Sequence, residues 1–417
     1  MKQKSPLLQR DGTKTVISSI LSILIGLAIG SVIVLIVSFT SSSITTKGGF
    51  EGVALVFLGL FSRGRNDVGA LIFGWNPRLM GDMFFRAIPL LMTGLSVAVA
   101  NKTGLFNIGA PGQYLMGTWA SLTVALSIPT SVVPAWLVWC LAFLAGMLAG
   151  AIWAAIPGIL KATRNINEVL GCIMTNWIAA NLVTLLFDIS NLKNAEEAGK
   201  IGYIKPTTAN GVATAKLGLD KIFKGSQINA GILIAILIAI GVYILMSKTT
   251  LGYELKACGS NRHAARYAGI NDKRNIVLSM AIAGAMSGAG AALYWLSGNT
   301  EFYWSTYQSL PAVGFNGIPV ALLAANNPIG VIFTAMFMSL LNICGQQLKT
   351  LTAYNEYITD IIIAVIVYLS SFSLIIKMWL SKKKKQSATA APAPAPAAEN
   401  TAPAAAAAED AGKENAQ

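Results

Sequence analysis

Two long stretches without any charged side chain constrain this chain more than its other features do. Residues 114–160 and 302–348 contain no Asp, Glu, Lys or Arg. A helix needs about 20 apolar residues to cross a bilayer, so each stretch is long enough for two crossings. Only 12% of the 417 residues are charged, about half the usual fraction in soluble proteins. The sequence therefore predicts an all-α, polytopic membrane protein.

The apolar segments predict about ten membrane-spanning helices. The two charge-free stretches divide at residues 128–134 and 326–328, where prolines end the helical pattern. Basic residues precede the first span and follow the last, which predicts that both termini are cytoplasmic. The expected spans are residues 16–39, 84–100, 112–126, 134–160, 169–187, 229–247, 275–296, 310–324, 328–348 and 357–376.

These spans divide the chain into a transmembrane domain at residues 16–380 and two flanking segments. Residues 1–15 are an expected cytoplasmic N-terminus, and the Ala/Pro-rich residues 381–417 are an expected disordered cytoplasmic tail. Residues 188–227 form a predicted external loop, and residues 248–274 form a predicted cytoplasmic loop. Between the first two spans, we expect a helix lying flat on the outer surface.

The composition argues against several classes of function. The basic residues behind the net charge of +13 lie largely at helix ends and in the tails. This placement indicates that they orient the helices in the membrane and contact membrane lipid, and it argues against nucleic-acid binding. The four cysteines are scattered, so we expect neither a metal site nor a disulfide framework. The sequence shows no paired carboxylates and no Ser/His/Asp set of the kind that catalysis requires. We therefore expect no catalytic residues and no cofactor.

The energy source is also constrained by the sequence. Ion-coupled carriers usually keep ionisable groups within their spans, and the candidates here are Arg86, Asp188 and Asp360, all near predicted span ends. No P-loop motif is present. The chain is thus either a passive pore or a transport subunit that takes its energy from another subunit.

A polar interruption follows the second span, at residues 101–114. Gly104, Gly109, Pro111 and Gly112 are unfavourable within a continuous helix. At membrane depth, a broken helix is tolerated only where it is packed in protein or lines a wet cavity. We therefore expect a translocation route lined by two amides, while a plain cytoplasmic connector is the alternative. The two amides are Asn107 and Gln113.

A similar motif occurs in the second half of the chain. Phe106-Asn107-Ile-Gly-Ala resembles Phe315-Asn316-Gly-Ile-Pro, and five predicted spans per half would make the second copy inverted. Paired Gly/Pro-interrupted segments in corresponding halves indicate a transport site. Amides and aromatic rings suit a neutral polar solute with a planar or sugar-like face. The expected substrate pathway comprises Phe106, Asn107, Gln113, Asn176, Trp177, Phe315 and Asn316.

The loop at residues 248–274 predicts two short helices. Tyr253–Cys258 forms the first, ended by Gly259; Asn261 caps the second, which runs through Ala268 and ends at Gly269. Such a knob could dock into a groove of a partner, whereas a structured basic loop is the alternative. The small side chains on its faces are Ala257, Ala264 and Ala265.

Several motifs resemble one family of transport proteins. Leu251-Gly-Tyr, Leu255-Lys-Ala-Cys-Gly-Ser-Asn and Ala268-Gly-Ile are similar to the coupling loop of bacterial ABC importer permeases for ribose-type sugars, branched-chain amino acids and nucleosides. Similar motifs begin at Pro89, Asn107 and Gly314, so the resemblance covers about residues 80–376. The form Gly-Leu-Phe-Asn-Ile-Gly is most like permeases paired with basic-membrane-lipoprotein-type nucleoside receptors. The sequence departs from the family's usual pattern at two prolines. Pro111 stands where many relatives have an acidic residue, and Pro319 stands where Ala is commoner.

The resemblance implies a type II ABC importer-like permease with two inverted five-helix halves. Nucleosides are the first expected solute, with ribose-type sugars as the alternative and a stand-alone carrier as a different class. The implied partners are an ABC ATPase subunit that uses the ATP, a second homologous permease and an extracellular solute-binding lipoprotein. The residues implied to couple to the ATPase are Leu255, Lys256, Ala257, Gly259, Asn261, Ala264, Ala265 and Gly269.

Overall fold

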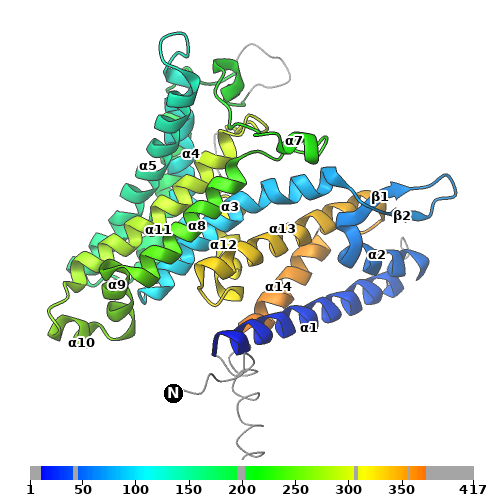
Figure 1. Ribbon diagram of the computed structural model, residues 1–417, viewed down its shortest axis with the longest axis horizontal. Coiled ribbons are helices and arrows are strands. Elements are labelled where there is room, and N and C mark those ends of the chain that lie inside the picture. Colours follow the sequence, from blue (N-terminus) through cyan, green and yellow to red (C-terminus); the bar gives the residue numbers. More distant parts are fainter. Residues whose placement is uncertain (1–10, 41–45, 195–201, 305–308, 356, 372–417) are drawn as a thin grey trace, which may run out of the picture. The chain divides into compact units, whose positions relative to one another are not determined.

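A computed structural model describes residues 11–40, 46–194, 202–304, 309–355 and 357–371. These residues form long helices joined by short connections, as Figure 1 shows, which confirms the predicted mainly helical membrane fold. Most of the predicted N-terminal segment 1–15 and all of the predicted tail 381–417 lie outside the described residues.

The helices and strands follow one another in this order. The N-terminal part contains α1 (Asp11–Thr40), α2 (Thr46–Leu58), the 3-10 helix η2 (Gly59–Phe61) and the antiparallel strands β1 (Ser62–Arg65) and β2 (Leu71–Phe73). Next come α3 (Pro77–Lys102), α4 (Ala110–Ser127), α5 (Ala135–Arg164) and α6 (Glu168–Asp188). The remaining elements are η3 (Thr207–Asn210), α7 (Leu219–Ile222), α8 (Gly231–Lys248), α9 (Thr250–Ser260), α10 (Arg262–Tyr267), α11 (Asp272–Trp295), α12 (Ala312–Leu323), α13 (Pro328–Leu351) and α14 (Tyr357–Ser371).

Each of the ten predicted spans overlaps one of these helices. Within the described residues, seven helices are long and apolar enough to cross a membrane, namely α1, α3, α5, α6, α8, α11 and α13. Helix α12 has 12 residues; at about 1.5 Å per residue it is about 18 Å long, short of the hydrocarbon core of about 30 Å. The segment 310–324 thus contains a half-length helix that is shorter than the predicted span, because Ala325 and Asn326 turn the chain with positive φ angles.

The segment before α3 also differs from the prediction. We expected one flat helix, whereas the structure has α2 followed by the β1–β2 hairpin. The hairpin sequence lacks an alternating apolar pattern, and Gly64 and Gly69 supply its left-handed backbone positions. Helix α3 begins at Pro77, earlier than predicted, because the Asn76 side chain accepts a hydrogen bond from the Leu79 amide and caps the helix.

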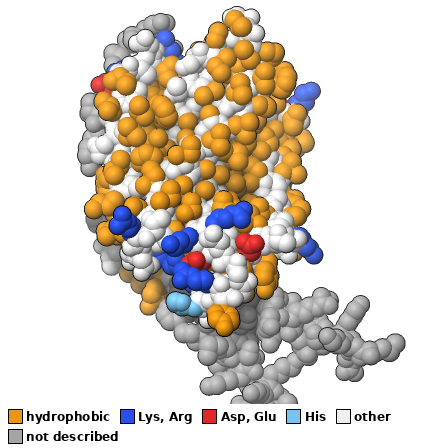
Figure 2. Space-filling view, turned by 90° about the vertical axis from the view of Figure 1, so that its left-hand side faces the viewer, with side chains coloured by type: hydrophobic (Ala, Val, Ile, Leu, Met, Phe, Trp, Pro, Cys, Tyr) orange, Lys and Arg blue, Asp and Glu red, His pale blue; other side chains and the backbone are white. Residues whose placement is uncertain are grey.

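An apolar surface covers one side of the molecule. Figure 2 shows this surface, with most of the charged side chains gathered below it beside the single histidine, which is His263 of α10. This distribution matches a membrane-embedded surface with α9 and α10 beyond one of its edges. Exposed apolar side chains on α5 and α8 include Leu141, Leu144, Leu148, Ile152, Leu233, Leu237 and Ile244.

Glycines bring α5 and α11 into backbone contact. A Cβ added to Gly150 would overlap the Gly284 carbonyl, and one added to Gly288 would overlap the Gly146 carbonyl. On α4, a Cβ added to Gly117 would lie 2.6 Å from the Gly288 Cα atom. The glycines of the sequence Gly284-x-x-x-Gly288 thus allow tight packing that joins three helices.

A second GxxxG motif, Gly26-x-x-x-Gly30 of α1, also packs closely. A Cβ added to Gly30 of α1 would lie 2.9 Å from the Ile362 side chain of α14, and one added to Gly26 would lie 2.9 Å from the Ile366 Cα atom. The first and last described helices are therefore held side by side, as Figure 1 shows.

The glycine contacts predict the effect of one substitution. In Gly288→Val, the added side chain overlaps the α5 backbone, so we expect a loss of about 1–3 kcal/mol of stability or failure to fold. The measurement is the thermal unfolding midpoint of the detergent-solubilised protein. Gly241→Val on α8 is the matched control, because a Cβ at Gly241 meets no atom within 4 Å. Equal midpoints for the two variants would contradict the packing argument.

Candidate functional site

A cavity of about 630 Å³ lies between α3, α4, α11, α12, α13 and α14. Its volume falls within the range of about 300–1,000 Å³ that is usual for small-molecule sites. Its lining residues are Arg86, Pro89, Leu90, Tyr114, Tyr294, Trp295, Pro311, Ala312, Val313, Asn316, Asn342, Gly345, Gln346, Tyr357, Thr359 and Asp360.

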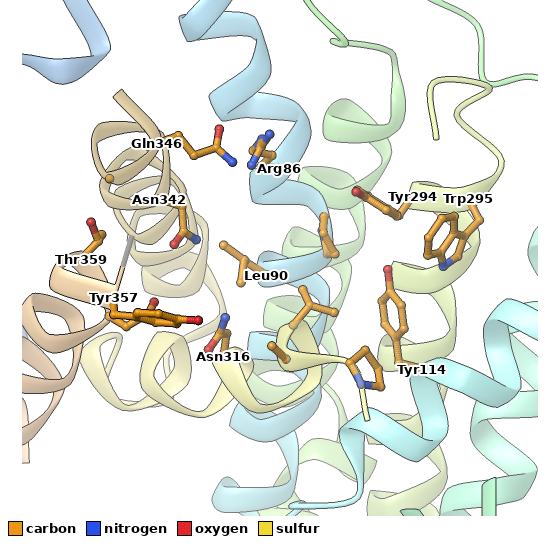
Figure 3. A pocket seen from close by; sticks show the side chains of 16 residues that line it. Arg86, Leu90, Tyr114, Tyr294, Trp295, Asn316, Asn342, Gln346, Tyr357 and Thr359 are labelled. Carbon is orange, nitrogen blue, oxygen red and sulfur yellow. The ribbon is translucent and has the colours of Figure 1, made fainter. Parts of the chain in front are cut away.

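The cavity has two chemically different walls, which Figure 3 shows on opposite sides of Leu90. One wall is aromatic and consists of Tyr114, Tyr294 and Trp295. The other is mainly polar and consists of Asn316, Asn342, Gln346, Tyr357 and Thr359. A solute with a planar face at one end and hydroxyl groups at the other would find matching chemistry on both sides.

The aromatic wall is held in place by ring contacts. Phe85 of α3 stacks on Tyr294 with ring centroids 5.2 Å apart, and Tyr294 meets Trp295 edge-on at 4.9 Å. Phe302 packs against the far side of Trp295 at 5.2 Å. Because the rings of Tyr294 and Trp295 are each fixed by neighbouring rings, this part of the wall is a preorganised surface.

Two buried donors at the cavity lack a partner. Arg86 Nε and Trp295 Nε1 are buried and form no hydrogen bond within the described part of the chain. Leaving a buried donor unpaired costs about 1–3 kcal/mol, so such groups call for a water or a ligand. Both donors belong to residues that line the cavity.

A second cavity, of about 530 Å³, adjoins the first and shares Arg86 and Gln346 with it. Gly225 and Gln227 of the predicted external loop contribute to it, so it lies at the predicted outer end of the helices. Arg86 and Gln346 thus stand where an outer recess meets the central cavity. The remaining lining residues are Ser62, Arg63, Gly64, Asn76, Arg78, Leu79, Asp82 and Gln347.

The predicted amides Asn107 and Gln113 are buried and bound to each other. Asn107 Nδ2 donates to Gln113 Oε1 at 2.9 Å, and Gln113 Nε2 donates to Asn107 Oδ1 at 2.8 Å. Asn107 Nδ2 also donates to Ser96 Oγ at 2.9 Å. The helical break itself spans residues 103–109, because Pro111 lies in the first turn of α4. The amides stabilise this break, and their place in a solute pathway stays a prediction.

The other predicted pathway residues lie in different environments. Asn176 is buried and holds the break, since it donates to the Ile108 carbonyl at 3.0 Å and accepts from the Gly112 amide at 2.9 Å. Trp177 is 45% exposed on the outer face of α6. Phe106 and Phe315 are half-buried, and Asn316 alone of the predicted set lines the central cavity.

The two similar motifs meet in the structure. A Cβ added to Gly314 of α12 would lie 2.5 Å from the Pro111 Cα atom, and one added to Gly317 would lie 2.6 Å from the Thr93 carbonyl carbon. Thr93 Oγ1 also donates to the Val313 carbonyl at 3.1 Å. Helix α12 therefore rests against both sides of the break, and this contact places Asn316 at the cavity.

The predicted coupling loop forms two capped helices. Thr249 Oγ1 accepts from the Gly252 amide to start α9, and Asn261 Oδ1 accepts from the Ala264 amide at 3.0 Å to start α10. The predicted Asn261 cap is confirmed, and Gly269 follows α10 with a φ of 81°. Gly259 does not end the first helix as we predicted, because α9 continues to Ser260.

An ionic contact fixes α10 to the start of α11. Asp272 accepts hydrogen bonds from Arg262 Nε at 2.6 Å and from Arg266 at 2.8 Å. The hydrogen bond that Arg266 donates to Asp272 raises the pKa of Arg266 above its ordinary value. Of the predicted coupling residues, Leu255 and Ala265 are buried, Ala257 and Gly259 are half-buried, and Lys256, Asn261, Ala264 and Gly269 are exposed.

Helix α9 touches the break between α3 and α4. A Cβ added to Gly259 would lie 2.5 Å from the Lys102 carbonyl oxygen and 2.8 Å from the Gly104 amide nitrogen. The break and this loop are thus in direct backbone contact. The end of α3 and the last turn of α9 therefore lie against each other without an intervening side chain.

Most of the cavity residues were missed by the sequence argument. The sequence argument considered Arg86, Asp188 and Asp360 only as ionisable groups near span ends. In the structure Arg86 and Asp360 line the cavity, whereas Asp188 forms an ion pair with Lys193. One signal in the sequence could have indicated the cavity. Asn342 and Gln346 lie four residues apart, so they share one face of a mainly apolar helix. The aromatic wall carries no comparable signal, because aromatic residues are common in apolar helices.

Comparison with known proteins identifies the family. Residues 79–371 match the family described as branched-chain amino acid transport system, permease component. The chain belongs to this permease family. No solved structure matches the permease.

Three curated relatives resemble the permease over most of its length. The guanosine ABC transporter permease protein NupP of Bacillus subtilis is 31% identical over 87% of this chain and 95% of its own. The nucleoside ABC transporter permease protein NupB of Lactococcus lactis is 36% identical over 76% and 90% of the two chains. The glucose ABC transporter permease protein TsgB13 of Haloferax volcanii is 30% identical over 69% and 74%.

The amide pair predicts a non-additive loss of stability. Asn107→Leu leaves Gln113 and Ser96 without a partner, and we expect a loss of about 1–3 kcal/mol. Adding Gln113→Leu removes the stranded amide, so the double variant should lose less than the sum of the single losses. Thermal unfolding of the solubilised permease measures this difference, and Asn181→Leu on the exposed face of α6 is the control. Additive losses would show that the two amides do not act together.

Proposed function

We propose that this chain is the membrane-spanning permease subunit of an ATP-binding cassette importer for nucleosides. The observation that carries the proposal is the central cavity, with an aromatic wall facing a polar one. The names of NupP and NupB, which refer to guanosine and nucleosides, support this choice of solute.

A nucleoside fits the two walls in one orientation. Its base is planar and apolar on its faces, so it stacks on the ring of Tyr294 and meets the perpendicular Trp295 ring with its edge. Its ribose hydroxyls both donate and accept, and they pair with the amides of Asn316 and Asn342 and the hydroxyl of Thr359. The outer recess leads solute past Arg86 to this site. Asn107 and Gln113 belong to the inner part of the same route.

We further propose the arrangement of the complete importer. Ten membrane helices form two inverted halves with both termini cytoplasmic, as in type II importers. The half-length α12 and the break before α4 are the corresponding interruptions of the two halves, and their contact at Gly314 and Pro111 supports this. A second permease, ATPase subunits and an external solute-binding lipoprotein complete the assembly.

The coupling route has three steps. The ATPase holds the exposed surface of α9 and α10 and moves these helices when it binds ATP. Gly259 transmits the movement to the backbone at residues 102–104, because no side chain separates the two segments. Helix α3 continues from there to Pro89 and Arg86, so the same movement reaches the cavity.

Uptake of labelled guanosine by cells with and without this gene tests the function. We expect the gene to confer uptake that unlabelled nucleosides block and that ATP depletion abolishes, while collapse of ion gradients leaves it intact. Uptake of ribose or glucose in place of nucleosides would favour the sugar alternative, which the similarity to TsgB13 supports. Uptake that survives ATP depletion would instead indicate a stand-alone carrier.

A substitution at Gly259 tests the coupling route. In Gly259→Val, the added side chain overlaps the backbone at residues 102–104 and forces α9 away from α3. We expect the assembled importer to hydrolyse ATP while solute uptake falls by at least about tenfold, since the movement no longer reaches the cavity. Hydrolysis and uptake are measured together in proteoliposomes. Ser260→Val, an exposed neighbour on α9, is the control; a Gly259→Val importer with normal uptake would refute the route.

A further inference from the structure

Arg86 is the one basic residue that lines the central cavity within the described part of the chain. Its Nε atom is buried without a hydrogen-bond partner, and its guanidinium forms no ion pair with the described acidic residues. A guanidinium carries five N–H donors and no acceptor. The solute is therefore the natural source of acceptors for this group.

The surroundings of Arg86 define what such a solute presents to it. In Figure 3 the Tyr294 hydroxyl and the Gln346 amide extend toward Arg86 from opposite walls. Phe85, the neighbour of Arg86 on α3, stacks on Tyr294 and fixes the distance between α3 and the aromatic wall. A base stacked on that wall therefore presents an edge, and not a face, to the guanidinium.

We propose that Arg86 determines base specificity, so that the permease takes 6-oxopurine nucleosides, guanosine and inosine, in preference to adenosine and pyrimidine nucleosides. This inference rests on the proposed function. Guanine and hypoxanthine carry two adjacent acceptors, O6 and N7, that match the paired donors of arginine. Adenine places its N6 amino donor opposite the guanidinium, and pyrimidines lack the N7 acceptor.

The charge of the cavity favours a nucleoside over a nucleotide. Asp360 of α14 lines the same cavity as Arg86. A phosphate dianion would be repelled by this carboxylate and would meet only one guanidinium. The neutral base edge satisfies the Arg86 donors without adding negative charge beside Asp360.

Competition for guanosine uptake measures the preference. Cells that carry the complete importer take up labelled guanosine while unlabelled inosine, adenosine, cytidine or guanosine monophosphate compete. We expect guanosine and inosine to compete at concentrations roughly tenfold lower than adenosine or cytidine, the difference that one bidentate arginine contact provides. Guanosine monophosphate should compete weakly.

Two variants and one analogue separate recognition from folding. Arg86→Lys keeps the charge but loses the paired donors, and Arg86→Gln loses both; either should reduce the guanosine-to-adenosine preference to about one. 7-Deazaguanosine lacks the N7 acceptor, so it should compete less well than guanosine in the unchanged permease and equally well in Arg86→Gln. Arg78→Gln, which changes an arginine of the outer recess only, should keep the preference.

The outcomes distinguish this inference from the proposed function. Nucleoside uptake without a 6-oxopurine preference, or a preference that survives in Arg86→Gln, overturns the role of Arg86 and leaves the nucleoside function in place. Strong competition by guanosine monophosphate also overturns it, because Arg86 then binds phosphate. Absence of nucleoside uptake overturns both proposals. Because the preference is a ratio, a lower amount of variant protein in the membrane does not affect it.

Discussion

Backbone contact through glycine is the interaction on which the rest of this structure depends. Lipid tails are as apolar as the helices they surround, so helix association requires close packing more than hydrophobic burial. Gly284 and Gly288 bring α11 against Gly146 and Gly150 of α5, and Gly117 adds α4 to the same contact. Since α11 also carries Tyr294 and Trp295, this contact holds the aromatic wall of the cavity in a fixed position.

A second set of close contacts joins the cavity to the coupling helices. Gly259 of α9 lies against the break that begins after Lys102, and Gly314 of α12 lies against Pro111 at the other end of the same break. Helix α3, which is almost wholly buried, leads from the break to Arg86. The proposed movement therefore needs no long chain of side-chain contacts, because one rigid helix connects both ends.

The sequence was sufficient for the membrane class, the helix order and the two short helices of the loop at residues 248–274, because each rests on local patterns such as apolar length, Asn261 as a cap and Gly269 as a stop. It located the break, but it could not predict that Asn107 and Gln113 bind each other, since only the fold brings the two amides together. The cavity could not be predicted, because it combines Arg86, Tyr294 and Asn342 from three separate helices. The half-length of α12 was missed because residues 310–324 are apolar enough to resemble a crossing.

The most direct test of the central claim is to find where a bound nucleoside lies. The complete importer, in membranes, is photolabelled with 8-azidoguanosine, and the labelled peptides are identified by mass spectrometry. Our account predicts label on α11 near Tyr294 and on α13 near Asn342, with excess guanosine preventing both. Label confined to the break at residues 103–109, or label that guanosine does not prevent, would contradict the assignment of the cavity as the nucleoside site.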